Sequence, residues 1–160
     1  MASWRGAFLV GSSVLLLDQI TKIWAVATLE GNRTIDLFWT FRLRLVRNTG
    51  AAFSQGEDLG PLLAALVCVV IIFLVRFARR FRDPVMRAAV GGIIGGALGN
   101  LLDRVLREGD GFLAAGVVDF LDLQWWPAFN LADTAIVIGG LLMLSRRFWM
   151  ERSCNFGSPS

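Results

Sequence analysis

The chain of 160 residues contains no histidine. Because histidine activates serine and cysteine nucleophiles and ligates many metals, its absence excludes Ser-His pairs, Cys-His pairs and histidine-ligated metal sites. Only two cysteines are present, Cys68 in an apolar run and Cys154 in a polar segment. They form no CxxC spacing, so neither a disulfide nor a metal site is indicated. We therefore expect no metal and no cofactor.

Apolar residues, in contrast, are abundant. They make up 55% of the chain, and the mean hydropathy is +0.58, which is too high for a soluble domain of this length. Four runs approach the roughly 20 apolar residues that a helix needs to cross a bilayer. They cover residues 7–29, 59–77, 85–106 and 129–149. The sequence therefore predicts a single domain over residues 1–160, an all-α integral membrane protein with four transmembrane helices.

The arginines predict the orientation of this domain. One cluster, RFARRFRDPVMR, separates the second and third runs, and another follows the fourth run. Because basic residues are enriched in cytoplasmic loops, we expect both clusters and both termini to be cytoplasmic. The net charge of +3 thus reflects membrane topology, and no nucleic-acid partner is indicated. Residues 30–58 and 107–128 are then extracytoplasmic, and residues 151–160 are expected to be a disordered tail.

Two local patterns predict structure outside and inside the bilayer. The segment TIDLFWTFRLRLVRN, residues 34–48, alternates apolar and polar residues and is rich in aromatic and β-branched types, which predicts extended strand. Small residues spaced by four let helix backbones approach closely in lipid. The third run has this spacing at Gly91, Gly95 and Gly99 and again at Gly92 and Gly96.

Three of the predicted helices carry polar residues at the same depth, near the outer leaflet. Ionisable residues inside a membrane are unfavourable and commonly mark functional sites. Asp18 precedes Lys22, the only lysine, by four residues, which predicts a helical ion pair. Asp103 has Arg104 beside it and Arg107 four residues on, so it too has a counter-ion. The remaining polar residues at this depth are Asn100, Asn130 and Asp133.

Asp133 has no basic residue within a turn, and two interpretations are open. It could form a capping box with Asn130 at the start of the fourth helix. Alternatively, it could face a second carboxylate. Two carboxyl groups within hydrogen-bonding reach share a proton, and one can then act as base on a water while the other donates a proton. The candidates for the second group are Asp110, Asp119 and Asp122.

The alternation of side chains along a strand lets only one of Asp119 and Asp122 face Asp133, but it does not show which one. Asp119 and Asp122 are three residues apart, so in an extended strand they point to opposite faces. Only one of them would point toward Asp133.

Five ordered blocks of the chain resemble the lipoprotein signal peptidase family, also called signal peptidase II. They are DQITK (18–22), NTGAAFS (48–54), GGALGNLLDR (95–104), VVDF (117–120) and FNLAD (129–133). The resemblance implies a four-span bacterial membrane aspartyl protease with a small extracytoplasmic β-cradle. Such an enzyme cuts prolipoproteins before a cysteine that carries diacylglyceryl. The matching motif positions imply Asp119 and Asp133 as the catalytic pair.

The resemblance also implies supporting residues and partners. It assigns site support or ligand contact to Asn48, Asn100, Arg104 and Asn130, with Asp18, Lys22 and Asp103 around them. Small residues in NTGAAFS, Gly50 among them, predict a flap with Phe53 on its apolar side, and an ordinary turn is the alternative. The implied partners are diacylglyceryl-modified prolipoproteins, membrane lipid and cyclic peptide antibiotics that act as inhibitors. The implied location is the bacterial inner membrane.

Two other functions would use some of the same residues. A Ser-Lys hydrolase could pair Lys22 with Ser12, Ser13 or Ser54, but it needs a neutral lysine, which Asp18 disfavours. A proton-coupled four-helix carrier could also use intramembrane Asp and Lys. Carriers usually show repeats or helix breaks at the midplane, whereas these charges gather at one edge.

Overall fold

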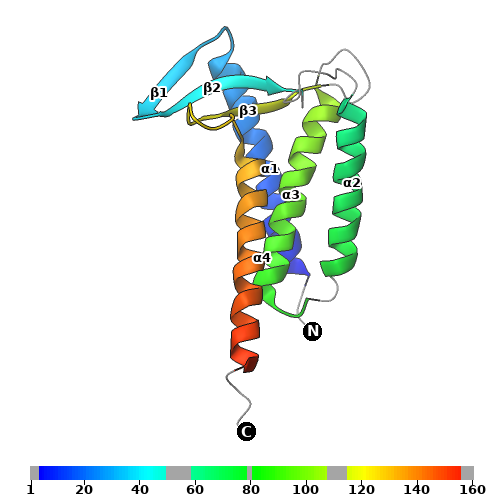
Figure 1. The fold of residues 1–160 in the computed structure, drawn as a ribbon. Coiled ribbons are helices and arrows are strands. Elements are labelled where there is room, and N and C mark those ends of the chain that lie inside the picture. Colours follow the sequence, from blue (N-terminus) through cyan, green and yellow to red (C-terminus); the bar gives the residue numbers. More distant parts are fainter. Residues whose placement is uncertain (1–3, 50–58, 79–80, 108–114, 156–160) are drawn as a thin grey trace.

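The computed structural model describes residues 4–49, 59–78, 81–107 and 115–155, which form four helices and a three-stranded antiparallel sheet. The helices stand side by side, and the sheet lies across one end of them (Figure 1). We call this the sheet end. The chain order is α1 (Arg5–Leu29), β1 (Thr34–Phe38), β2 (Phe41–Asn48), α2 (Leu59–Ala78), α3 (Pro84–Leu106), β3 (Val117–Asp122) and α4 (Leu131–Asn155).

The four helices coincide with the four predicted apolar runs to within a few residues, except at the end of the last. Helix α4 continues to Asn155, so the first part of the predicted disordered tail is helical. The reason lies in the composition of this segment, because no glycine or proline interrupts it before Gly157. Within the described residues, only α1 and α3 are both long and apolar enough to cross a membrane by length and composition.

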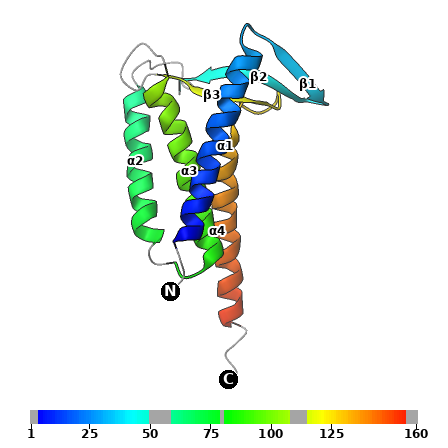
Figure 2. The same ribbon diagram turned by 180° about the vertical axis from the view of Figure 1, so that it is seen from behind.

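Helix α3 is the centre of the bundle and packs against the other three helices (Figures 1 and 2). An added Cβ at Gly91 or Gly95 would overlap the backbone carbonyl of Ala7 or Gly11 on α1. On another side of α3, an added Cβ at Gly96 would lie 2.6 Å from the carbonyl oxygen of Ala132 on α4. The predicted role in close helix packing is thus confirmed for Gly91, Gly95 and Gly96, whereas an added Cβ at Gly92 would meet only the Val10 side chain, at 3.8 Å.

The predicted single strand over residues 34–48 is instead a hairpin. Strand β1 pairs with β2 through a turn at Trp39 and Thr40, and Trp39 adopts a left-handed backbone conformation with φ of 49°. No glycine, asparagine or proline marks this turn, so the pattern of residue types did not reveal it. The strand order is β1-β2-β3, and the register between β2 and β3 shifts between Leu43 and Val46.

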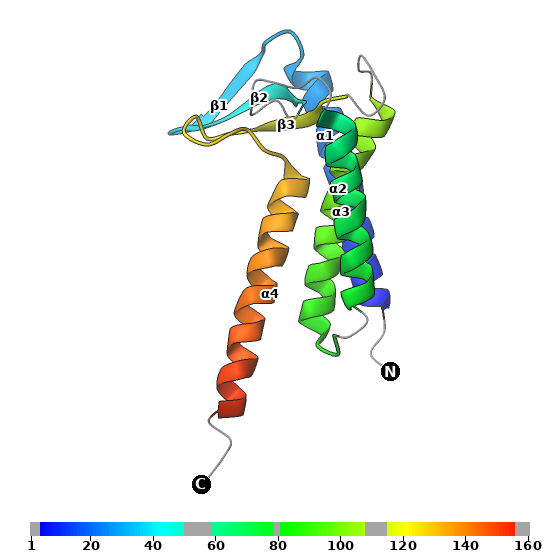
Figure 3. The same ribbon diagram turned by 45° about the vertical axis from the view of Figure 1, so that its right-hand side comes forward.

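An apolar cluster holds the sheet against α1. Phe120 of β3 packs with Ala25 and Leu29 of α1, and four partly buried apolar residues of the sheet surround them. Because neighbouring residues in a strand point to opposite faces, burial of Phe120 turns Asp119 away from this cluster. Figure 3 shows that α4 leaves the sheet end and diverges from α2 along its length.

Candidate active site

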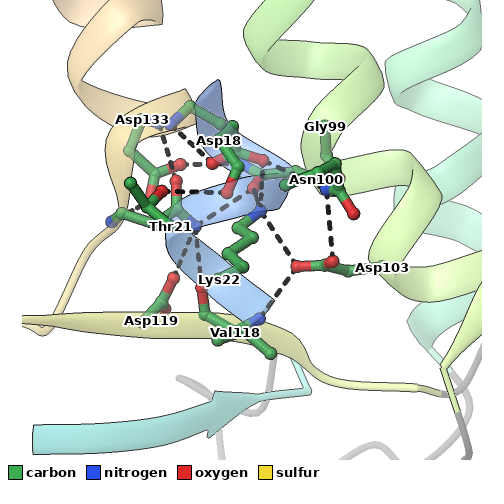
Figure 4. A network of polar contacts seen from close by, with 12 residues as sticks. Asp18, Thr21, Lys22, Gly99, Asn100, Asp103, Val118, Asp119 and Asp133 are labelled. Carbon is green, nitrogen blue, oxygen red and sulfur yellow. Dashed lines mark hydrogen bonds and ion pairs between the residues drawn. The ribbon is translucent and has the colours of Figure 1, made fainter. Parts of the chain in front are cut away.

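Lys22 is the centre of a buried polar network between α1 and α3 (Figure 4). Its ammonium nitrogen lies 2.8 Å from Asp18 Oδ2 and 2.9 Å from Asp103 Oδ2, and it donates to Asn100 Oδ1 at 2.8 Å. The predicted Asp18–Lys22 ion pair is confirmed. The Lys22 nitrogen is thus engaged by two carboxylates and an amide, none of which is the serine that a Ser-Lys pair requires.

Asp103 links α3 to the first strand residues of β3. Besides Lys22, it binds Arg107 Nε at 2.8 Å and accepts the backbone N–H of Val118 at 3.1 Å. The counter-ions of Asp103 are therefore Lys22 and Arg107. Arg104, its sequence neighbour, is not among them, because adjacent residues point to different sides of a helix.

Arg104 has a distinct environment. Its Nη1 atom is buried and has no hydrogen-bond partner within the described residues. Its guanidinium interacts electrostatically with Asp119, Asp103 and Asp133, yet makes no ion pair with any of them within 4.0 Å. A buried guanidinium nitrogen without a partner is unfavourable, so Arg104 Nη1 is the buried donor at this site that the described residues leave unsatisfied.

The start of α4 is a capping box. Asn130 Oδ1 accepts the backbone N–H of Asp133 at 2.9 Å, and Asp133 Oδ2 accepts the backbone N–H of Asn130 at 3.2 Å. Asp18 Oδ1 accepts a third N–H of this helix end, that of Ala132, at 3.0 Å. The capping interpretation of Asp133 is therefore confirmed.

The same cap also places Asp133 beside a second carboxylate. Asn130 Nδ2 donates to Asp119 Oδ1 at 2.7 Å, so one amide side chain bonds to Asp119 while its own backbone bonds to Asp133. Asn100 Nδ2 donates to the other oxygen of Asp133 at 2.8 Å. No hydrogen bond joins the two carboxylates directly within the described residues, and Asn130 lies between them. The two interpretations of Asp133 are thus compatible.

Asp119 is buried at the centre of the sheet end. Only 1% of it is exposed, and its other oxygen accepts from Asn48 Nδ2 at 3.1 Å. The pKa of Asp119 is raised to about 6, chiefly by burial and also by the nearby charge of Asp133, while hydrogen bonds from Asn48 and Asn130 oppose the shift. A carboxyl group with this pKa can exchange protons near neutral pH.

Asp122 lies elsewhere and has basic partners. Arg42 Nε and Arg44 Nε lie 2.8 Å and 3.0 Å from Asp122 Oδ2. Burial acts to raise the pKa of Asp122, but hydrogen bonds from the Gln124 N–H and both guanidiniums hold it below its ordinary value. Of the two acids that β3 supplies, the structure thus brings Asp119 to Asp133. Of the other predicted site positions, Gly50, Phe53, Asp110 and Ser54 lie outside the described residues.

One contributor was not indicated by the sequence patterns above. Gln19 Nε2 donates to Asp18 Oδ2 at 3.2 Å and to the Gly99 carbonyl at 3.1 Å, which joins α1 to α3 beside Lys22. The available signal was a second polar residue directly after Asp18 in an apolar run.

The comparison with protein families agrees with this arrangement. The family model described as Signal peptidase (SPase) II matches residues 10–149 of the chain. This chain belongs to the signal peptidase II family. The match includes every residue of the polar network described above. The chain is therefore a bacterial membrane protein of a peptidase family, and no comparison supports a carrier.

Individual relatives cover most of the chain. It is 44% identical over 138 residues to the lipoprotein signal peptidase of Rhodococcus jostii, which covers 86% of this chain and 69% of the relative. It is 41% identical over 147 residues to the lipoprotein signal peptidase of Syntrophomonas wolfei, with 90% and 91% covered. A solved structure of a bacterial membrane enzyme, determined by the in meso method, superposes with a TM-score of 0.76 at 26% identity and covers 88% of this chain and 90% of its own.

Proposed function

We propose that this protein removes signal peptides from prolipoproteins as an aspartic endopeptidase, with Asp119 and Asp133 as its catalytic pair. The observation that carries the mechanism is the Asn130 bridge between two carboxylates from β3 and α4. Without histidine in the chain, these carboxylates are the groups available for acid and base catalysis on a peptide bond.

The proposed reaction divides the two protons of hydrolysis between the two carboxyl groups. The ionised member takes a proton from a water molecule, and the water oxygen attacks the carbonyl carbon of the scissile bond. The protonated member donates to the carbonyl oxygen, which gives a tetrahedral diol. As the C–N bond breaks, the carboxyl group that took the water proton gives it to the leaving nitrogen, and one diol hydroxyl returns a proton to the other carboxylate. The raised pKa of Asp119 favours it as the protonated member. Asn100 and Asn130 hold Asp133 in place as the base.

Arg104 has the properties expected of a substrate contact. Its buried Nη1 hydrogen-bonds to nothing within the described residues, and a guanidinium is a strong donor to a carbonyl oxygen. We assign it to hold the substrate backbone beside the carboxylates. Asn48 is assigned to orient Asp119, to which it donates a hydrogen bond.

The proposed placement in the membrane has all four helices crossing the bilayer. Helix α1 begins and α4 ends at the end opposite the sheet (Figure 1), and this is also the end where α2 ends with Arg76 in its last turn and where α3 begins. Arginine-rich ends face the cytoplasm, so the sheet end lies at the outer leaflet of the inner membrane. A cysteine anchored there by diacylglyceryl brings its peptide bond to the same depth. Prolipoprotein, membrane lipid and cyclic peptide inhibitors are the proposed partners.

This topology is tested with an epitope tag at each terminus. In intact spheroplasts both tags should resist a protease added outside, and they should be digested only after the membrane is permeabilised. Digestion of both tags in intact spheroplasts would invert the orientation and place the carboxylates at the wrong leaflet.

The catalytic pair is tested by three single substitutions. Asp119→Asn and Asp133→Asn keep side-chain size and most hydrogen bonds but cannot exchange the proton. Each should fold, and each should lower cleavage of a purified diacylglyceryl-modified prolipoprotein by orders of magnitude. The double variant should be little worse than either single variant, since the two groups act as one unit.

Asp122→Asn is the matched control on the same strand, and it should keep most activity because its partners are the partly exposed Arg42 and Arg44. If Asp133 served only as a cap, its replacement by Asn would cost at most about 1 kcal/mol of stability and leave cleavage intact. Normal cleavage by Asp133→Asn together with an inactive Asp122→Asn variant would refute the pair.

A further inference from the structure

Four large aromatic side chains gather at the free end of the sheet. Phe38 ends β1, Trp39 begins the β1–β2 turn, and Trp125 and Trp126 follow β3. We call these four residues the aromatic tip. The sheet projects sideways beyond α4, so the β1–β2 turn lies away from the helices (Figures 1 and 3). The Gln124 side chain donates to the Thr40 carbonyl at 3.0 Å and ties the two loops together.

The side chains of the tip are exposed, although ion pairs join the strands that carry them. Trp39 is 96% exposed, Phe38 and Trp125 are each 70% exposed, and Trp126 is 59% exposed. The ion pairs of Asp122 with Arg42 and Arg44 fix β2 to β3 just behind the tip. Large apolar side chains on a fixed scaffold and in one place indicate a surface that is covered in the working protein.

The backbone at Trp39 supports the same conclusion. Its φ of 49° lies in the left-handed region, which a bulky side chain rarely adopts. At the α1–β1 connection the same region is occupied by Gly31 and Asn32, residue types that tolerate it. A tryptophan at such a position is strained, and its exposed ring offers no compensating contact within the described residues.

Position and chemistry identify the covering surface as lipid. The tip lies at the end of the bundle where α1 ends and α4 begins, and Trp126 precedes α4 by only a few residues. Tryptophan is enriched where membrane-crossing helices meet the headgroup region, because its ring is apolar and its N–H is polar. Arg42 and Arg44 lie partly exposed beside the tip and share one carboxylate, Asp122, so this group keeps a net positive charge that suits lipid phosphates.

We propose that the aromatic tip inserts into the headgroup region of the outer leaflet and sets the depth of the sheet above the lipid. Asp119 lies on β3, the strand that leads directly to Trp125 and Trp126. Anchoring this strand at the tip therefore fixes the height of Asp119 relative to the lipid-anchored substrate, a consequence that rests on the proposed function. The anchoring itself does not depend on it.

The test measures the depth of the tip directly in the full chain. In a background with Cys68→Ser and Cys154→Ser, Trp39→Cys is labelled with the fluorophore NBD and reconstituted into phosphatidylcholine vesicles. The vesicles contain lipid with a spin label either just below the headgroup or near the chain end. We expect blue-shifted emission and several-fold stronger quenching by the shallow label than by the deep one. Trp125→Cys is the second labelling site should Trp39→Cys fail to fold.

Arg33→Cys, exposed at the opposite end of β1, is the matched control and should be weakly quenched by either label. Equal quenching at positions 39 and 33 would overturn the proposal. So would an NBD group at position 39 that is shielded from water but not quenched by lipid, because a protein surface would then cover the tip. Cleavage is not part of either measurement, so failure of the proposed function would leave the result unchanged.

Discussion

Replacement of Lys22 by methionine should strongly destabilise the protein. Methionine matches the length of the lysine stem but removes the charge that Asp18 and Asp103 share. Both carboxylates are buried, and Asp18 has no other cation within the described residues, whereas Asp103 keeps Arg107. The variant therefore leaves one carboxylate without a counter-ion in a poorly solvated environment.

The expected magnitude follows from this uncompensated charge. Removal of one partner from a buried ion pair costs about 3–5 kcal/mol, whereas the intact pair contributes little relative to an apolar replacement. At about 2–4 °C per kcal/mol for a chain of this size, the melting temperature should fall by roughly 10 °C. The cleavage rate should fall by more than the loss of folded protein explains. Lys22 also donates to Asn100, and the Asn100 amide in turn donates to Asp133.

The assay is thermal unfolding of the purified protein in detergent, with cleavage of a lipidated prolipoprotein measured below the transition. Asp18→Asn combined with Lys22→Met removes the pair together and should recover most of the melting temperature. The Asn oxygen can still accept the Ala132 N–H. A Lys22→Met protein that melts within about 2 °C of the original chain, with no gain in the double variant, would refute this reasoning.

Three further predictions concern pH, helix packing and substrate contact. Burial raises the pKa of Asp119 from an ordinary 3.8 to about 6. The folded state therefore holds this proton more tightly than the unfolded state, and the stability that the protonated form contributes should be lost as the pH rises from 3.8 to about 6. Cleavage should also fall on the alkaline side, where Asp119 is no longer protonated. Melting curves of Asp119→Asn should lack this pH dependence. Gly95→Ala should lower stability by about 1–3 kcal/mol by overpacking against α1, whereas Gly92→Ala should be near neutral in a melting assay because its Cβ would lie 3.8 Å from the nearest atom. Arg104→Ala should fold but lose cleavage, and a fully active variant would exclude Arg104 from substrate binding.

Features that depend on neighbours along the chain could be predicted from the sequence. The length of each apolar run fixes a helix, which is why α2 begins at Leu59 as expected. The Asp18–Lys22 pair and the Asn130–Asp133 capping box each join residues one turn apart, so helical periodicity brings them together wherever the helix lies.

Features that depend on packing between distant segments were decided only by the tertiary structure. Alternation showed that Asp119 and Asp122 face opposite ways, but burial of Phe120 against α1 selected which one meets Asp133. The side-chain amide of Asn130 reaches Asp119 only because β3 lies beside the start of α4. Such contacts depend on which apolar faces are removed from water together, and no local period encodes that choice.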